Sequence, residues 1–110
     1  MQNQAHSQDS ILAEIVRRLV TAFQPEQIYL FGSKARGDSS PDSDYDLMVI
    51  VSNETAPERR RSRLAYQALR GTGTAADVLV CTEQYFQERL HLPSSLPAIV
   101  IREGVLLYER

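Results

Sequence analysis

Two aspartates spaced one residue apart, Asp44 and Asp46, are the residues of this sequence best suited to carry chemistry. They precede an apolar run, Leu47 to Val51, that predicts a β-strand. Because side chains alternate faces along a strand, residues i and i+2 would present both carboxylates on one side. Each of two such close charges raises the pKa of the other, and a divalent cation relieves that conflict. Oxygen ligands with no His or Cys nearby favour Mg²⁺ over Zn²⁺.

A second polar element, Gly32 followed by Ser33, ends an earlier apolar segment that runs from Gln27 to Phe31. Glycine lets backbone amides approach an anion closely, and the serine hydroxyl adds a rotatable donor. If residues 33–36 form a helical turn, its free N–H groups also point towards that anion. A phosphate-binding turn followed shortly by carboxylates for a hard metal indicates a nucleoside triphosphate site.

This compound motif resembles the nucleotidyltransferase superfamily related to DNA polymerase β. The family pattern is Gly-Ser, ten residues and Asp-x-Asp, and Lys34 to Ser43 supply those ten residues. The sequence is most similar to the minimal nucleotidyltransferase (MNT) branch in two segments, Ala35-Arg36-Gly37 and Asp42-Ser43-Asp44-Tyr45-Asp46-Leu47. These are prokaryotic one-domain proteins, many of them paired with a HEPN-domain ribonuclease toxin. The resemblance covers nearly the whole chain, and its specific part is residues 31–51. A lone Asp-x-Asp is common, so the evidence lies in the combination.

The resembled family places a third carboxylate on a strand beside the Asp-x-Asp pair. Asp77 opens the apolar stretch from Val78 to Cys81, and it is the only acidic residue between Glu58 and Glu83. We therefore expect Asp77 to complete the site, either at a second metal ion or as the group that accepts the proton of the attacking hydroxyl. A solvated strand end is the alternative interpretation.

The resemblance implies attack by an acceptor hydroxyl on the α-phosphorus of a nucleoside triphosphate, with release of pyrophosphate. The three aspartates are expected to be catalytic and to bind two Mg²⁺ ions, and Gly32 with Ser33 to bind the distal phosphates. Arg36 is the preferred counter-charge for the nucleotide over Lys34, because a guanidinium can bind a phosphate bidentately. Either cation could equally be a solvated loop residue.

The composition predicts one small domain in the cytoplasm. Of the 110 residues, 43% are hydrophobic and 24% are charged, and no apolar run reaches membrane-spanning length. A net charge of −2 disfavours general nucleic-acid binding, and the run Arg59-Arg60-Arg61 is interpreted as a solvated helix face rather than as a contact for an acidic partner. The single cysteine, Cys81, fits a reducing compartment. Residues 1–8 lack a signal-peptide pattern and are expected to be disordered, and residues 9–110 to form a single nucleotidyltransferase domain.

The hydrophobic periodicity predicts an α/β (α+β) fold in which helices pack against a small mixed sheet, the polymerase β-like nucleotidyltransferase fold. Apolar residues recur at helical spacing from Ile11 to Phe23, and Pro25 ends that helix. Both faces of the second strand become apolar beyond Asp46, so we expect cover on both sides of the sheet. The remaining expected elements are strands at 27–31, 45–51, 76–81 and 105–108, and helices at 57–70, after Thr82, and after Ser94 or Ser95.

The resemblance further implies a Mg²⁺-dependent protein adenylyltransferase that acts as an antitoxin. It would transfer AMP from ATP to a hydroxyl, with tyrosine favoured, of a HEPN-type ribonuclease toxin in a hetero-oligomer. A binding-only antitoxin that neutralises its partner without catalysis is the alternative. A third possibility is a small-molecule or tRNA nucleotidyltransferase, but those relatives carry additional domains for their acceptors, for which 110 residues leave no room.

Overall fold

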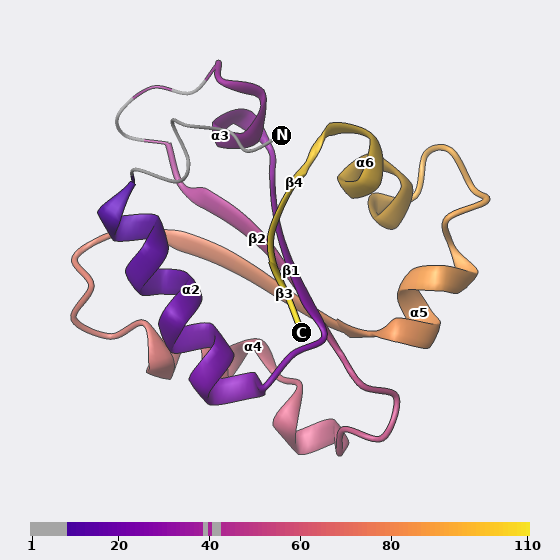
Figure 1. Cartoon of the computed structure of the whole chain (residues 1–110), viewed down its shortest axis with the longest axis horizontal. Helices are drawn as coiled ribbons and strands as arrows, with labels where there is room; N and C mark the ends of the chain where they lie inside the picture. The colour runs from indigo at the N-terminus through magenta and orange to yellow at the C-terminus, as the bar shows by residue number, and fades with distance from the viewer. Residues whose placement is uncertain (1–8, 39, 41–42) are drawn as a thin grey trace.

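The computed structural model describes residues 9–38, 40 and 43–110, so the expectation for residues 1–8 lies outside the described residues. Within them, four strands form one sheet, and helices pack on both of its faces (Figure 1). The strands are β1 (Gln27–Phe31), β2 (Tyr45–Val51), β3 (Ala76–Thr82) and β4 (Val105–Glu109). The helices are α2 (Ser10–Phe23), α3 (Ser33–Arg36), α4 (Ser62–Ala68), α5 (Glu83–Glu88) and α6 (Leu96–Glu103), with a 3₁₀ turn η1 (Pro57–Arg59). No helix in these ranges is long and apolar enough to cross a membrane.

The sheet is mixed, as the sequence predicts. Its strand order is β3-β2-β1-β4; β1 runs antiparallel to both β2 and β4, while β2 and β3 are parallel. A parallel pair needs a crossover, which η1 and α4 supply. The register aligns Asp46 with Phe31 of β1 and with Asp77 of β3. The start of β2 therefore lies between the Gly-Ser turn and the third aspartate.

Each face of the sheet buries its own group of apolar side chains. Under α2 and α4 the group includes Leu12, Ile15, Leu19, Leu47, Val49 and Val78. Under α5 and α6 it consists of Met48, Ile50, Phe86 and Val100. Burial of such a side chain contributes about 1.5–3 kcal/mol, so both helix layers are fixed to the sheet. The expected cover on both faces of β2 is present.

Polar caps set the ends of the helices. The Asp9 carboxylate caps α2 and accepts from an amide of the first turn at 3.0 Å. At the other end Gln24 takes a left-handed conformation with φ of 47°, so the helix stops just before Pro25. Thr82 caps α5, as the sequence predicts, and Ser95 rather than Ser94 caps α6.

The single helix predicted over residues 57–70 is wrong. The chain forms η1, then an extended Arg61 with ψ of 143°, and only then α4. Two side-chain hydrogen bonds accompany this break. Arg60 Nε donates to a carbonyl of the preceding loop at 3.0 Å, and Ser62 Oγ donates to the Val78 carbonyl of β3 at 3.3 Å. Both contacts are to backbone remote from the helical pattern, so periodicity could not reveal them.

Candidate active site

Gly32 brings the loop after β1 into contact with Asp46 of β2. Its φ of 76° and ψ of −160° lie in a region that is essentially restricted to glycine. A Cβ at this position would collide with Oδ2 of Asp46, which is the nearest atom to it. The position therefore needs glycine for two reasons, the backbone conformation and the close approach of the carboxylate.

The turn that follows is α3, which begins at Ser33. The carbonyl of Gly32 accepts from the amides of Ala35 and Arg36, each at 3.1 Å, and the Ser33 carbonyl accepts from Gly37 at 3.0 Å. The first amide of a helix has no partner within it. The Ser33 amide and hydroxyl form no hydrogen bond with any other residue that the structure describes, so both can donate to a ligand.

Three aspartates lie on one face of the sheet where β2 and β3 begin. Asp46 and Asp77 are partners in the parallel register, and Asp44 lies two residues before Asp46, on its side by strand alternation. Partial burial, followed by the charges of Asp77 and Asp44, raises the pKa of the Asp46 carboxyl, while Arg36 lowers it. Each of these charges is thus close enough to act on Asp46, and the structure brings the three predicted carboxylates together.

The donor chemistry of this cluster fits a hard divalent cation, although the cluster is not preformed. Among the described residues, no group of three or more His, Cys, Asp and Glu side chains is arranged to hold a metal ion. Carboxylate oxygens are the ligands that Mg²⁺ prefers, and the repulsion that raises the pKa of Asp46 is what a bound cation would relieve. Asp44 and Asp46 are the residues that could hold it, and Asp77 is exposed and could join them by rotating its side chain.

The two loop cations lie on different sides of the sheet. Arg36 Nε lies 3.3 Å from Oδ2 of Asp38, Arg36 Nη1 lies 3.7 Å from Oε1 of Glu103, and the charge of Arg36 acts on the carboxylate cluster. Lys34 Nζ instead lies 4.5 Å from the ring centre of Tyr45, whose side chain packs in the core beneath α2. Arg36 is therefore the cation on the carboxylate side.

Tyr45 is a supporting residue that the sequence analysis missed. Its hydroxyl donates to Oδ2 of Asp9 at 2.6 Å, while Oδ1 of Asp9 caps α2. Burial, together with this carboxylate, raises the pKa of the Tyr45 phenol to about 12. Strand alternation places Tyr45 on the face opposite the aspartates, but its partner Asp9 is remote in sequence and carries no local signal. The bond fixes the start of β2 to the helix layer.

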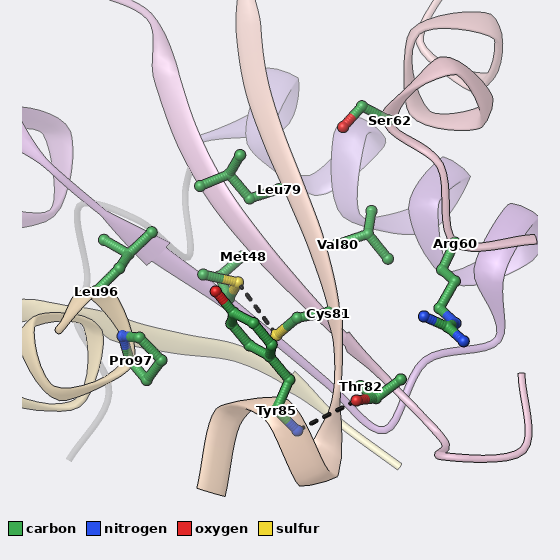
Figure 2. Close-up of a pocket in the computed structure, with 10 residues that line it drawn as sticks. All are labelled: Met48, Arg60, Ser62, Leu79, Val80, Cys81, Thr82, Tyr85, Leu96 and Pro97. Atoms are coloured by element: carbon green, nitrogen blue, oxygen red, sulfur yellow. Dashed lines mark hydrogen bonds between the residues drawn. The ribbon is translucent and has the colours of Figure 1, made fainter. Parts of the chain in front are cut away.

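A cavity of about 440 Å³ lies beyond the carboxylates along β2 and β3 (Figure 2). Met48 and Leu79 line it, each two residues beyond an aspartate on the same face. Further lining residues are Cys81, Tyr85, Leu96 and Pro97. Cys81 donates to the Met48 sulfur at 3.7 Å, and burial raises the pKa of its thiol to about 11, so it is a protonated packing residue. No sequence signal marked this cavity.

This chain resembles known proteins in both sequence and fold. Residues 10–106 match the sequence profile of a family described as nucleotidyltransferase domain. A solved candidate nucleotidyltransferase from Sulfolobus solfataricus aligns at a TM-score of 0.61 with 27% identity, over 91% of this chain and 78% of that chain. A toxin-antitoxin structure with AMP-PNP (TM-score 0.60, 21% identity) and a mutant of the toxin-antitoxin MntA-HpeT (TM-score 0.60, 20% identity) each cover 89% of this chain and 73% of theirs. Both of these structures have the same fold as this chain. No curated protein sequence matches the chain significantly.

Proposed function

Because this chain belongs to the nucleotidyltransferase domain family, we propose that it transfers AMP from ATP to a hydroxyl of a partner protein, which it neutralises as an antitoxin. The observation that carries the proposal is the contact between Gly32 and the Asp46 carboxylate. This contact joins the phosphate-binding turn to the carboxylate cluster, so that one triphosphate can reach both.

The Gly-Ser turn holds the distal phosphates in this proposal. The amide and hydroxyl of Ser33 donate to phosphate oxygens, and the bare backbone of Gly32 lets them approach. Arg36 lies on the same side and supplies a positive charge. Its guanidinium group can donate two parallel hydrogen bonds to two oxygens of one phosphate. These contacts leave the α-phosphate over the start of β2.

The carboxylates act on the α-phosphate and on the attacking hydroxyl. Asp44 and Asp46 would hold Mg²⁺, which when bound neutralises triphosphate oxygens and lowers the pKa of the hydroxyl. The hydroxyl oxygen forms a bond to the α-phosphorus, and pyrophosphate leaves with the electron pair of the broken P–O bond. The hydroxyl proton passes to the Asp77 carboxylate, which stands on the neighbouring strand.

ATP as donor and a toxin protein as acceptor are supported by proteins of the same fold. One toxin-antitoxin structure contains AMP-PNP, an ATP analogue, and the MntA-HpeT structure is also a toxin-antitoxin pair. The MNT motif adds a HEPN-type ribonuclease as the partner and a tyrosine as the acceptor. A phenol with a pKa of about 10 is a suitable nucleophile once a neighbouring cation and carboxylate lower the cost of its ionisation.

Neutralisation by binding alone is the second candidate function. It is favoured by the same toxin-antitoxin structures, since a tight complex could block a toxin without any chemistry. The two candidates differ in one observable, the covalent state of the partner.

The test is to incubate the protein with ATP, Mg²⁺ and the product of the neighbouring gene, and then to weigh that product by mass spectrometry. We expect a gain of one or more adenylates, loss of the partner's ribonuclease activity, and neither effect with Asp44→Ala. Glu58→Gln, which changes an exposed carboxylate outside the cluster, is the matched control and should transfer normally. A partner that is inhibited but unmodified would support the binding-only function instead.

A further inference from the structure

The outer edge of β3 carries no paired strand among the described residues, because β3 is the terminal strand of the sheet. The Val78 carbonyl faces this edge, since it accepts from Ser62 Oγ on the side away from β2. Backbone groups of alternate residues point the same way, so the N–H and C=O of Val80 also face outwards. Such an edge is a template for pairing with another polypeptide.

The cavity described above straddles this edge (Figure 2). Strand alternation places Leu79 and Cys81 on the carboxylate face and Val80 on the opposite face. Arg60 and Ser62 line the cavity beside Val80, and Tyr85 and Leu96 line it beside Leu79. An extended polypeptide directs successive side chains to opposite faces, so one added strand could fill both halves of the cavity. A nucleoside has no comparable row of backbone donors and acceptors.

The same edge is flanked by positive charge. Four arginines lie within five residues, namely Arg59, Arg60, Arg61 and Arg63. Arg60 lines the cavity, whereas Arg59 Nη2 donates to the Ala22 carbonyl of α2 at 3.4 Å. None of the four forms an ion pair with a described residue, although the chain as a whole carries a net charge of −2. Unpaired cations beside a docking edge favour acidic partners and speed their encounter.

We propose that the acceptor protein binds as an added strand along the outer edge of β3, through a segment that carries both acidic and apolar side chains. This inference rests on the proposed function and names the acceptor surface of that site. Asp77 stands on the same strand, about 10 Å from Val80 at roughly 3.3 Å per residue, so a hydroxyl from the docked segment can reach it. The Gly-Ser turn lies on the other side of β2, which leaves the β3 side to the acceptor. The predicted helix face at Arg59-Arg60-Arg61 is wrong, because Arg59 ends η1 and Arg60 and Arg61 lie in the link before α4; Arg60 and Arg61 are then part of the binding surface.

Backbone pairing is tested by hydrogen exchange at the Val80 amide, measured by NMR. Exchange should slow severalfold when the product of the neighbouring gene is added, and should stay unchanged with AMP-PNP and Mg²⁺ alone. Protection that rises with the concentration of this chain alone would assign the edge to a second copy. Protection by AMP-PNP would assign the cavity to the nucleoside. Either result overturns the proposal.

Kinetics test the two side-chain contributions. Leu79 is 40% exposed, so Leu79→Ala should fold normally and raise the KM for the acceptor without changing the KM for ATP. Arg61→Glu should raise the acceptor KM about three- to tenfold, whereas Arg70→Glu, an exposed change two residues beyond the end of α4, should not. If wild type transfers adenylate but Leu79→Ala and Arg61→Glu both keep the wild-type acceptor KM, the proposed docking surface is wrong and the proposed function stands. If wild type transfers no adenylate, the proposed function itself fails.

Discussion

Replacing Gly32 by alanine tests the contact that joins the two halves of the site. The backbone at Gly32 has φ of 76° and ψ of −160°, a combination that costs a residue with a Cβ about 1–3 kcal/mol. The new methyl group would also meet Oδ2 of Asp46, so that either the loop or the carboxylate must move. Because domains of this size have unfolding free energies of about 5–15 kcal/mol, the variant should remain folded.

We expect Gly32→Ala to lower the free energy of unfolding and to reduce transfer about a hundredfold, the effect of misplacing a reacting group by roughly 1 Å. Gly73→Ala is the matched control, since Gly73 has φ of 75° and no atom within 4 Å of its would-be Cβ. That variant should lose about 1–2 kcal/mol through backbone strain alone and transfer normally.

Urea unfolding at pH 7 and adenylate transfer measured by mass spectrometry give the two readouts. A double variant, Gly32→Ala with Asp46→Ala, removes the collision but keeps the backbone strain, so its free energy of unfolding should exceed the value expected from adding the two single changes by about 0.5 kcal/mol or more. Full transfer by Gly32→Ala, or strictly additive stabilities in the cycle, would refute the claim that this contact organises the site.

Three further predictions concern neighbouring residues. Burial and nearby carboxylates raise the pKa of the Asp46 carboxyl above its ordinary value of 3.8. The contribution of Asp46 to the free energy of unfolding should therefore fall as the pH rises from 3.8 through the raised pKa of the folded state, and stay level at higher pH. Asp46→Asn should therefore stabilise the protein in chelator at pH 7. The measurement is urea unfolding of wild type and Asp46→Asn from pH 3 to 7, and an equal dependence of their free energies of unfolding on pH would contradict the prediction. Tyr45→Phe should lower the free energy of unfolding by about 1–3 kcal/mol, because it removes the donor to the Asp9 carboxylate; an unchanged urea midpoint would be the opposing result. Arg36→Gln should raise the KM for ATP about tenfold, whereas Lys34→Gln, which alters the cation against Tyr45, should raise it much less; equal effects in steady-state kinetics would remove the distinction between the two cations.

The sequence predicted those parts of the fold that depend on local pattern. Strands β1 and β2 have the predicted ends because apolar runs there are bounded by Gly32 and by Asp44 and Asp46. The mixed sheet with helices on both faces is confirmed, since β2 is apolar on both sides. The break before α4 was not foreseen, because Ser62 is held by a hydrogen bond to β3 rather than by its own neighbours.

In the candidate site, too, local sequence pattern predicts some features and not others. Spacing alone could place Asp44 and Asp46 on one side of a strand. The pairing of Asp77 with Asp46 depends on the register of a parallel crossover, and it was suggested by the family resemblance together with the position of Asp77 as the lone acidic residue of its stretch. The collision that forbids a side chain at Gly32 needs a three-dimensional backbone conformation. The open edge of β3 is likewise a property of strand order, which no local pattern encodes.

Transfer of the α-phosphate is tested most directly by supplying ATP labelled either at the α-phosphate or at the γ-phosphate, with Mg²⁺ and the product of the neighbouring gene. Nucleotide transfer predicts that the α-label becomes covalently attached to the partner and that the γ-label leaves entirely in pyrophosphate. Asp46→Asn should abolish attachment of the α-label. Attachment of the γ-label would instead identify a phosphoryl transfer, and attachment of neither label to a partner that is nevertheless inhibited would show that the carboxylate cluster is not used for catalysis.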